Sequence, residues 1–225
     1  MLKYGKLKQK VRRDFTMTQK RARSQEAIEQ RYRDILSAAR KLFLVKSYDQ
    51  ISLVSLAKQL DISRPSFYTY FPSKDALFLQ LLKEEGLDFA KEIRTHFTHQ
   101  LPLQEFCMEL MKQVLNKPLF IKLLSIPFTS FQCTQTDDET AQFRSEVLPF
   151  FQALADSFQQ QFPQAPESEI WTAVHQSYLT ITTVSNYGFF AQIQEEENLD
   201  FFGSESPITP LYFYSEMLCK LYKDI

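Results

Sequence analysis

The chain has 225 residues, of which 44% are apolar and 24% charged, values ordinary for a globular protein of one or two domains. Four glycines are too few for a glycine-rich phosphate loop or a turn-dense all-β fold. No apolar run reaches the roughly 18 residues of a membrane span. The basic N-terminus also lacks an apolar signal core, so we expect a soluble cytoplasmic protein.

The net charge of −1 conceals a strong asymmetry along the chain. Residues 1–75 carry 17 Lys/Arg and 7 Asp/Glu, whereas residues 76–225 carry 9 and 20. A basic N-terminal part joined to an acidic remainder is typical of a protein that docks one end onto a polyanion. The alternative is a basic tail that only maintains solubility.

Residues 1–23 contain nine Lys/Arg and a single acid, Asp14. We predict a disordered arm, which adds nonspecific affinity for a polyanion rather than ordered contacts.

Three helices are predicted next, at 24–45, 53–60 and 64–70. The first has apolar residues at helical spacing, and Ser52 and Ser63 are placed to cap the second and third. Separation of the last two by a three-residue turn predicts a helix-turn-helix over residues 24–73. A plain three-helix bundle is the alternative.

The turn and the contact between these two helices have recognisable residues. Asp61 is expected in a left-handed conformation, which Asp tolerates better than most residues. Pro65 falls in the first turn of its helix, where a missing N–H costs nothing. Ala57 allows close crossing, and the expected shared core consists of Leu56, Leu60, Ile62 and Phe67.

Over residues 28–78 the sequence resembles the DNA-binding domain of TetR-type transcriptional regulators. The most specific part runs from Phe67 to Leu77, FYTYFPSKDAL. Family members usually have Gly where Ser47 and Asp61 stand. The resemblance implies an all-α protein, with an N-terminal helix-turn-helix domain and a larger helical ligand-binding and dimerisation domain over residues 74–225.

The helix at 64–70 is predicted to enter the major groove of double-stranded DNA. Arg64 can pair with both acceptors of a guanine, and Ser66 and Tyr70 share its face. Ser52 lies at a helix N-terminus, where phosphate is favoured. By resemblance, Tyr68 and Lys74 contact the DNA backbone; the alternatives are a core tyrosine and a solvated lysine.

The acidic part is predicted to be helical at 76–97, 104–115, 119–131, 139–162, 167–192 and 209–222. Prolines fall mostly between these segments, as helix breakers do. Pro127 and Pro149 lie inside them, and either kink a helix or mark a boundary.

The family resemblance implies that helix 76–97 transmits a signal and that the last two helices form a homodimer. Expected interface positions are Leu179, Thr183, Phe190, Leu211, Tyr214, Leu218 and Leu221. It also implies a pocket for a small apolar or aromatic ligand, with an ordinary aromatic core as the alternative. Expected lining residues are Met108, Met111, Phe120, Leu124, Phe128, Phe151, Trp171, His175 and Tyr178.

No metal site, cofactor or catalytic site is expected. The three cysteines form no CxxC pair, and His96 and His99 lack partners at ligand spacing. The favoured function is a homodimeric regulator, most simply a repressor released from a palindromic operator by a ligand. The first alternative is a DNA-bound module that recruits a protein and senses no small molecule; the second is an enzyme carrying a basic arm.

Overall fold

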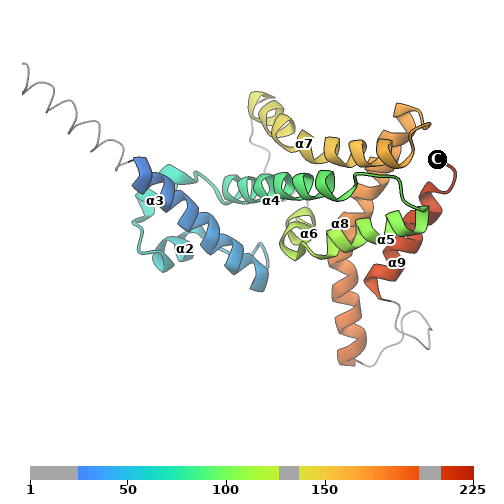
Figure 1. The fold of residues 1–225 in the computed structure, drawn as a ribbon. Helices are drawn as coiled ribbons and strands as arrows, with labels where there is room; N and C mark the ends of the chain where they lie inside the picture. The colour runs from blue at the N-terminus through green and yellow to red at the C-terminus, as the bar shows by residue number, and fades with distance from the viewer. Residues whose placement is uncertain (1–24, 127–136, 198–208) are drawn as a thin grey trace, which may run out of the picture. The chain divides into compact units, whose positions relative to one another are not determined.

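The computed structural model describes residues 25–126, 137–197 and 209–225. The predicted arm, residues 1–23, lies outside these ranges. The chain divides into two compact units, Met1–Lys74 and Asp75–Ile225, which we call unit 1 and unit 2. Every regular element in the described ranges is helical, with no strand, so the all-α prediction is confirmed (Figure 1).

Unit 1 contains a helix covering residues 25–45, followed by α2 (Leu53–Gln59) and α3 (Arg64–Tyr70). Both short helices begin where the serines predict. The Ser55 N–H donates to Ser52 Oγ, and the Ser66 N–H donates to Ser63 Oγ, each at 3.3 Å. These bonds satisfy backbone donors that lack partners in the first turn of a helix.

The turn between α2 and α3 is closed by a Schellman motif. The Ile62 N–H donates to the Ala57 carbonyl at 2.9 Å, and the Asp61 N–H donates to the Lys58 carbonyl at 3.3 Å. Asp61 has a φ of 52°, which confirms the predicted left-handed conformation. This turn sets the direction in which α3 leaves α2.

The core of unit 1 joins the helix over residues 25–45 to α2 and α3. Phe67 is the buried residue of α3, and Leu56 and Ala57 are buried on α2. Leu60 and Ile62, expected in this core, are only half-buried because they lie at the turn. Tyr32 stacks on Phe71 with ring centroids 5.1 Å apart.

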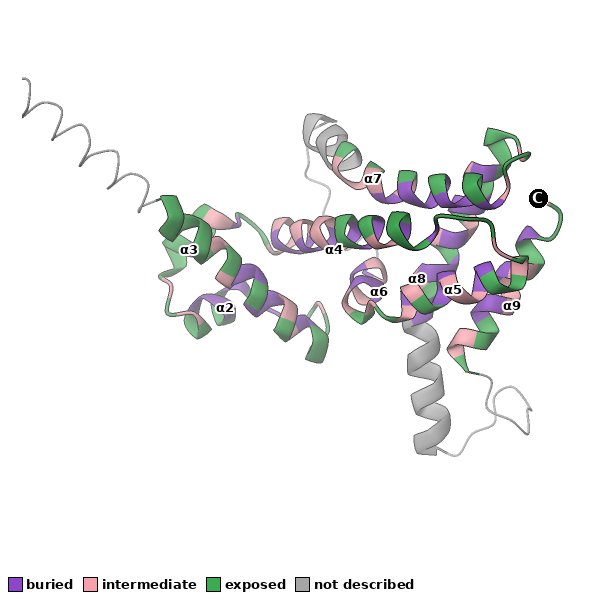
Figure 2. Cartoon of the chain, viewed as in Figure 1, coloured by how far each residue is buried: buried purple, intermediate pink, exposed green. Residues whose placement is uncertain are grey.

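Unit 2 is built from most of α4 and from five further helices. The six helices are α4 (Lys74–His96), α5 (Leu103–Leu115), α6 (Pro118–Leu124), α7 (Asp137–Gln161), α8 (Glu167–Glu197) and α9 (Pro210–Tyr222). α5 packs against α9, and α8 contacts α6, α7 and α9. Buried positions gather where α5, α8 and α9 meet (Figure 2).

Two helix boundaries in unit 2 differ from the prediction by five residues or more, and the others agree within two residues. α6 ends at Leu124 instead of residue 131, because the residue before a proline disfavours helical geometry and Pro127 follows closely. α8 continues to Glu197, five residues beyond its predicted end. α7 continues through Pro149, so this proline marks no helix boundary.

Aromatic rings form much of the core of unit 2, the part of the sequence in which 17 of the 21 Phe residues fall. One cluster joins Phe89, Phe120 and Phe150, with ring centroids 5.2–5.8 Å apart. A second joins Phe106, Phe158 and further rings, including that of Tyr222. Edge-to-face and offset pairs at such distances each add about 0.5–1.5 kcal/mol beyond the burial of their area.

Candidate nucleic-acid interface and apolar pocket

The surface of α3 carries the predicted DNA-contacting side chains. Phe67 is turned into unit 1, whereas Arg64, Ser66 and Tyr68 are exposed and Tyr70 is half-buried. The Tyr68 side chain is 38% exposed, which excludes the alternative of a core tyrosine. One buried anchor therefore holds a seven-residue helix whose remaining face can meet a ligand.

Arg64 is organised by its neighbour one turn later. Its guanidinium carbon lies 5.9 Å from the centroid of the Tyr68 ring, within the range of a cation–π contact. A ring contact of this kind uses none of the N–H donors of the guanidinium, which stay available to a ligand. The planar arrangement of these donors suits bidentate pairing with guanine or with phosphate.

Hydroxyl groups at the starts of α2 and α3 have defined local roles. Ser52 Oγ accepts the N–H of Ser55 and remains on an exposed residue, so its own O–H can still donate to a phosphate. Thr69, which the sequence analysis did not select, is also exposed on α3, and its hydroxyl donates to the Ser66 carbonyl at 2.7 Å. Its exposure follows from the burial of Phe67, which turns the flanking residues outward.

The Lys74 ammonium is held by contacts with Tyr48. Its Nζ donates to the Tyr48 carbonyl at 3.0 Å and lies 3.9 Å from the centroid of the Tyr48 ring. The segment between the first helix and α2 therefore holds the ammonium at the start of α4. Tyr48 was not predicted from the sequence. The signal that could have identified it is an aromatic residue in a short break between two helices.

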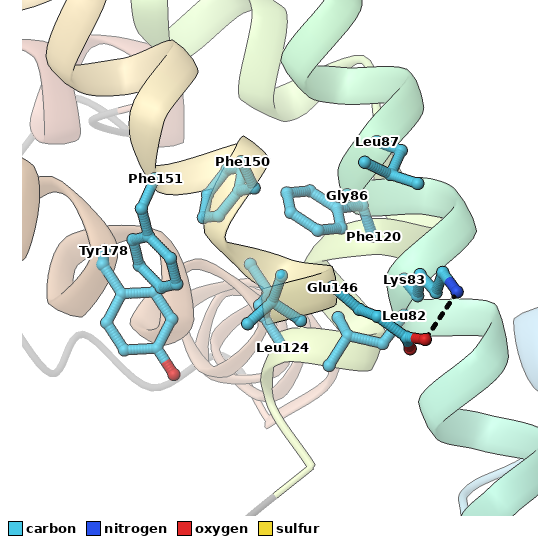
Figure 3. Close-up of a pocket in the computed structure, with 11 residues that line it drawn as sticks. Leu82, Lys83, Gly86, Leu87, Phe120, Leu124, Glu146, Phe150, Phe151 and Tyr178 are labelled. Atoms are coloured by element: carbon cyan, nitrogen blue, oxygen red, sulfur yellow. Dashed lines mark ion pairs between the residues drawn. The ribbon is translucent and has the colours of Figure 1, made fainter. Parts of the chain in front are cut away.

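Unit 2 contains an apolar pocket formed by α4, α6, α7 and α8 (Figure 3). It has about 430 Å³ of space not filled by protein atoms, part of it open to solvent. Its lining consists of Leu82, Lys83, Gly86, Leu87, Phe120, Leu124, Glu146, Val147, Phe150, Phe151 and Tyr178. Segments almost a hundred residues apart in the chain thus meet around one space.

Four of the nine predicted lining residues border this pocket: Phe120, Leu124, Phe151 and Tyr178. Four do not: Met108, Met111, Trp171 and His175. Phe128 lies outside the described residues. The four residues that do not border the pocket lie on other faces of their helices, which pack in the core or contact solvent.

The positions of the four that do not line it are specific. Met111 is fully buried in the core, and Met108 Sδ accepts the Ser215 hydroxyl at 3.7 Å. His175 is exposed, and its Nδ1–H donates to the Trp171 carbonyl at 2.7 Å. The Trp171 indole N–H donates to Glu167 at 3.4 Å, toward the start of α8.

Polar groups in the pocket are few. Lys83 Nζ and Glu146 Oε1 form an ion pair at 3.0 Å, with side chains 27% and 28% exposed (Figure 3). Phe151 and Tyr178, whose ring centroids lie 5.4 Å apart, stand on the other side of the pocket in this view. Burial raises the pKa of the Tyr178 hydroxyl above its ordinary value, so this group stays neutral at physiological pH.

The outer face of α8 and α9 exposes large apolar side chains. Leu179 is 63% exposed and Tyr212 53%, and Phe213 and Leu221 are also exposed. Tyr214 and Leu218, predicted for a dimer interface, are instead buried within unit 2. Their neighbours on α9 face outward because the helix presents its Tyr214–Leu218 stripe to α5 and α8.

The remaining predicted interface positions are Thr183, Leu211 and Phe190. Thr183 is exposed and Leu211 half-buried, while the side chain of Phe190 lies outside those described.

Neither a metal centre nor a membrane-spanning helix is found within the described ranges. No group of three His, Cys, Asp or Glu side chains is arranged there to hold a metal ion. None of the helices within these ranges has the length and hydropathy needed to cross a membrane.

These features define a helix-turn-helix protein with a separate, larger helical unit. Residues 35–81 match the family model of bacterial regulatory proteins of the tetR family. Over 64 residues the chain is 44% identical to the HTH-type transcriptional regulator EthR of Mycolicibacterium smegmatis, covering 26% of this chain and 30% of that protein. Over 48 residues it is 48% identical to the uncharacterized HTH-type transcriptional regulator YuxN of Bacillus subtilis, covering 21% and 16%.

Solved structures extend the likeness of fold across both units. A tetR-family transcriptional regulator from Streptomyces coelicolor superposes with a TM-score of 0.56 at 19% identity, covering 87% of this chain and 78% of that one. The regulator FadR of Bacillus subtilis, solved in complex with stearoyl-CoA, superposes with a TM-score of 0.53 at 19% identity, covering 86% and 99%. Residues 35–81 therefore resemble the DNA-binding segment of tetR-family regulators, and the likeness of the rest of the described chain is one of fold alone.

Proposed function

We propose that this protein is a cytoplasmic, sequence-specific DNA-binding repressor, which binds a palindromic operator as a homodimer and leaves it when a small molecule occupies the pocket of unit 2. The observation that carries this proposal is the surface of α3. There Phe67 anchors the helix, and Arg64, Ser66 and Tyr68 face outward within the segment that matches the family.

The DNA-binding step follows from the geometry of unit 1. Arg64 reads guanine through its paired donors, and Ser66 and Tyr70 contact neighbouring bases or phosphates. Ser52, Tyr68 and Lys74 bind the DNA backbone and so set the register of α3 in the groove. The excess of basic residues in residues 1–75 adds the sequence-independent attraction to phosphate.

Dimerisation is supported by the exposed apolar side chains of α8 and α9. A seven-residue helix reads only a few base pairs, whereas two such helices about 34–36 Å apart read both halves of an inverted repeat. Leu179, Tyr212 and Phe213 are the side chains that a second copy of the chain would cover. Burying large apolar groups of this kind is the usual source of affinity between subunits.

Ligand sensing is supported by the pocket. A fully packed unit 2 would favour the alternative module that recruits a partner protein, whereas an apolar space bordered by few polar groups is typical of small-molecule sites. Release then follows if the ligand favours a placement of α4 in which the two recognition helices no longer match the groove.

Selection of bound oligonucleotides from a random DNA pool, at near-physiological salt, tests the DNA-binding step. We expect an inverted repeat whose half-sites lie one helical turn apart. Arg64→Ala is expected to cost about 1–3 kcal/mol of operator binding and to relax the preference at one base pair. Arg33→Ala, which removes an exposed arginine from the helix over residues 25–45, is the matched control.

Recovery of no motif, together with loss of all retained DNA on addition of salt, would contradict the proposal. In that case unit 1 would be an electrostatic anchor only.

A further inference from the structure

Gly86 leaves a gap in the pocket wall that neither backbone geometry nor packing demands. It lies in the interior of α4, where alanine is more stable than glycine. A Cβ built at this position would lie 3.6 Å from a ring carbon of Phe120 and 3.9 Å from Phe150 Cβ, which are ordinary contact distances. The missing side chain therefore keeps open the part of the pocket that Gly86 borders, near the ring of Phe120 (Figure 3).

The size of that space limits the ligand. The empty space of about 430 Å³ includes open solvent, so the part enclosed by the pocket walls is smaller and suits only a small ligand. It accommodates a system of one or two fused rings, which can stack on the surrounding Phe side chains. A long acyl chain with a large polar head does not fit this volume.

The ion pair at the pocket decides the charge of the ligand. A cationic ligand can take the place of the Lys83 ammonium on Glu146, because the flexible lysine stem can carry its charge out to water. An anionic ligand would instead have to displace Glu146 from Lys83, and the shorter glutamate stem carries its charge less far than the lysine stem does.

Two further properties favour the cation. The faces of Phe120, Phe150 and Phe151 attract positive charge. Residues 76–225 also contain 20 Asp/Glu against 9 Lys/Arg, and this excess of negative charge attracts cations and repels anions.

We infer that the ligand of this pocket is a small aromatic amine, with its ring system beside Gly86 and its ammonium paired with Glu146. Gly86 and Glu146 are then the residues that determine specificity for size and charge. The inference rests on the proposed function, in that it takes this pocket as the ligand site.

Three probes with one ring system and different charges test the inference by isothermal titration calorimetry at pH 7. They are 1-naphthylmethylamine as the cation, 1-naphthylmethanol as the neutral analogue and 1-naphthoate as the anion. We expect the amine to bind at least about tenfold more tightly than either of the others. Naphthoate binding as tightly as the amine, or more tightly, overturns the inference.

Two variants localise the effect. Glu146→Gln is expected to weaken the amine about tenfold and to leave the alcohol unchanged, whereas Glu105→Gln, which removes an exposed carboxylate from α5, leaves both unchanged. Equal losses in these two variants would mean that only the general negative field attracts the amine, and would overturn the assignment of Glu146.

Gly86→Leu fills the gap and is expected to weaken all three probes by about tenfold or more. Gly86→Ala, whose methyl group has room, keeps the fold and weakens them less. Unchanged binding in a folded Gly86→Leu variant overturns the size argument. If Gly86→Leu does not fold, unchanged binding in the Gly86→Ala variant overturns the size argument instead.

Operator release is measured separately with the same probes. If the amine binds as expected but the operator stays bound, ligand-released repression fails and the chemistry of the pocket stands. If the operator is released by naphthoate and not by the amine, the proposed function stands and this inference fails.

Discussion

Units 1 and 2 place their candidate sites in opposite ways. In unit 1 the site is the outer face of one seven-residue helix, held by a single buried phenylalanine. In unit 2 the site is an interior space bordered by side chains from residue 82 to residue 178. A surface site on a short helix depends on local order, whereas an interior pocket depends on how distant helices meet.

Loss of the anchor of α3 is expected to have the largest effect. Phe67→Ala removes a side chain that is 1% exposed and should cost about 3–5 kcal/mol of unfolding free energy in unit 1. Because the anchor holds the DNA-facing helix, operator binding is expected to disappear while binding of 1-naphthylmethylamine persists. Circular dichroism melting with both binding assays measures this.

The matched change in unit 2 is Phe89→Ala, at a side chain with no exposed surface. It is expected to abolish binding of the amine and to spare the helicity of unit 1. If both variants instead lower a single common transition, the contrast between the two units is overturned.

A buried hydroxyl pair gives the next largest effect, about 1–3 kcal/mol. Ser177 donates to the Ala173 carbonyl at 2.7 Å, so the Tyr222 hydroxyl, 2.6 Å from Ser177 Oγ, is the donor in their shared bond. Ser177→Ala leaves the buried Tyr222 hydroxyl without this acceptor and should destabilise unit 2 in urea unfolding. Tyr222→Phe should lower the free energy of unfolding less in the Ser177→Ala variant than in the parent chain. Equal losses in both backgrounds would contradict the pairing.

The same tyrosine predicts a loss of stability at high pH. Burial is the main cause that raises the pKa of Tyr222 above its ordinary value of about 10, so the folded state holds this proton more tightly than the unfolded state. Its contribution is complete below pH 10 and decreases as pH rises further, by about 1.4 kcal/mol per pH unit. Tyr222→Phe should flatten this decrease, and an unchanged pH profile would exclude the assignment.

The smallest expected effect is a gain in unit 1. Asp61 has a φ of 52°, a conformation that favours glycine, so Asp61→Gly should stabilise the α2–α3 turn by up to about 1 kcal/mol. Asp61→Ala, which cannot relieve the strain, should be no more stable than the parent chain. Thermal melting of both variants measures the difference, and equal melting temperatures would show that the turn stores no strain.

Unit 1 could be predicted from sequence with few errors because its signals are local. The caps at Ser52 and Ser63 and the left-handed turn at Asp61 each depend on hydrogen bonds within a few residues, and the structure contains all three. The contact of Lys74 with Tyr48 was missed because it joins residues 26 positions apart.

The pocket could be predicted only in part. Helical spacing places Trp171, His175 and Tyr178 on one face, yet only Tyr178 borders the pocket. Spacing identifies residues that share a face but not what that face meets. Gly86 and the Lys83–Glu146 pair were missed because a single glycine and two ordinary charges have no pattern in sequence.

The sequence by itself determined the helical class, the capped helix-turn-helix and the contrast between a basic and an acidic part. Each of these follows from composition or from interactions between near neighbours in the chain. Only the tertiary structure decided which aromatic rings enclose a space, that Tyr214 and Leu218 face inward, and that Gly86 borders the pocket. These outcomes depend on contacts between distant helices, whose side chains must fill one common volume.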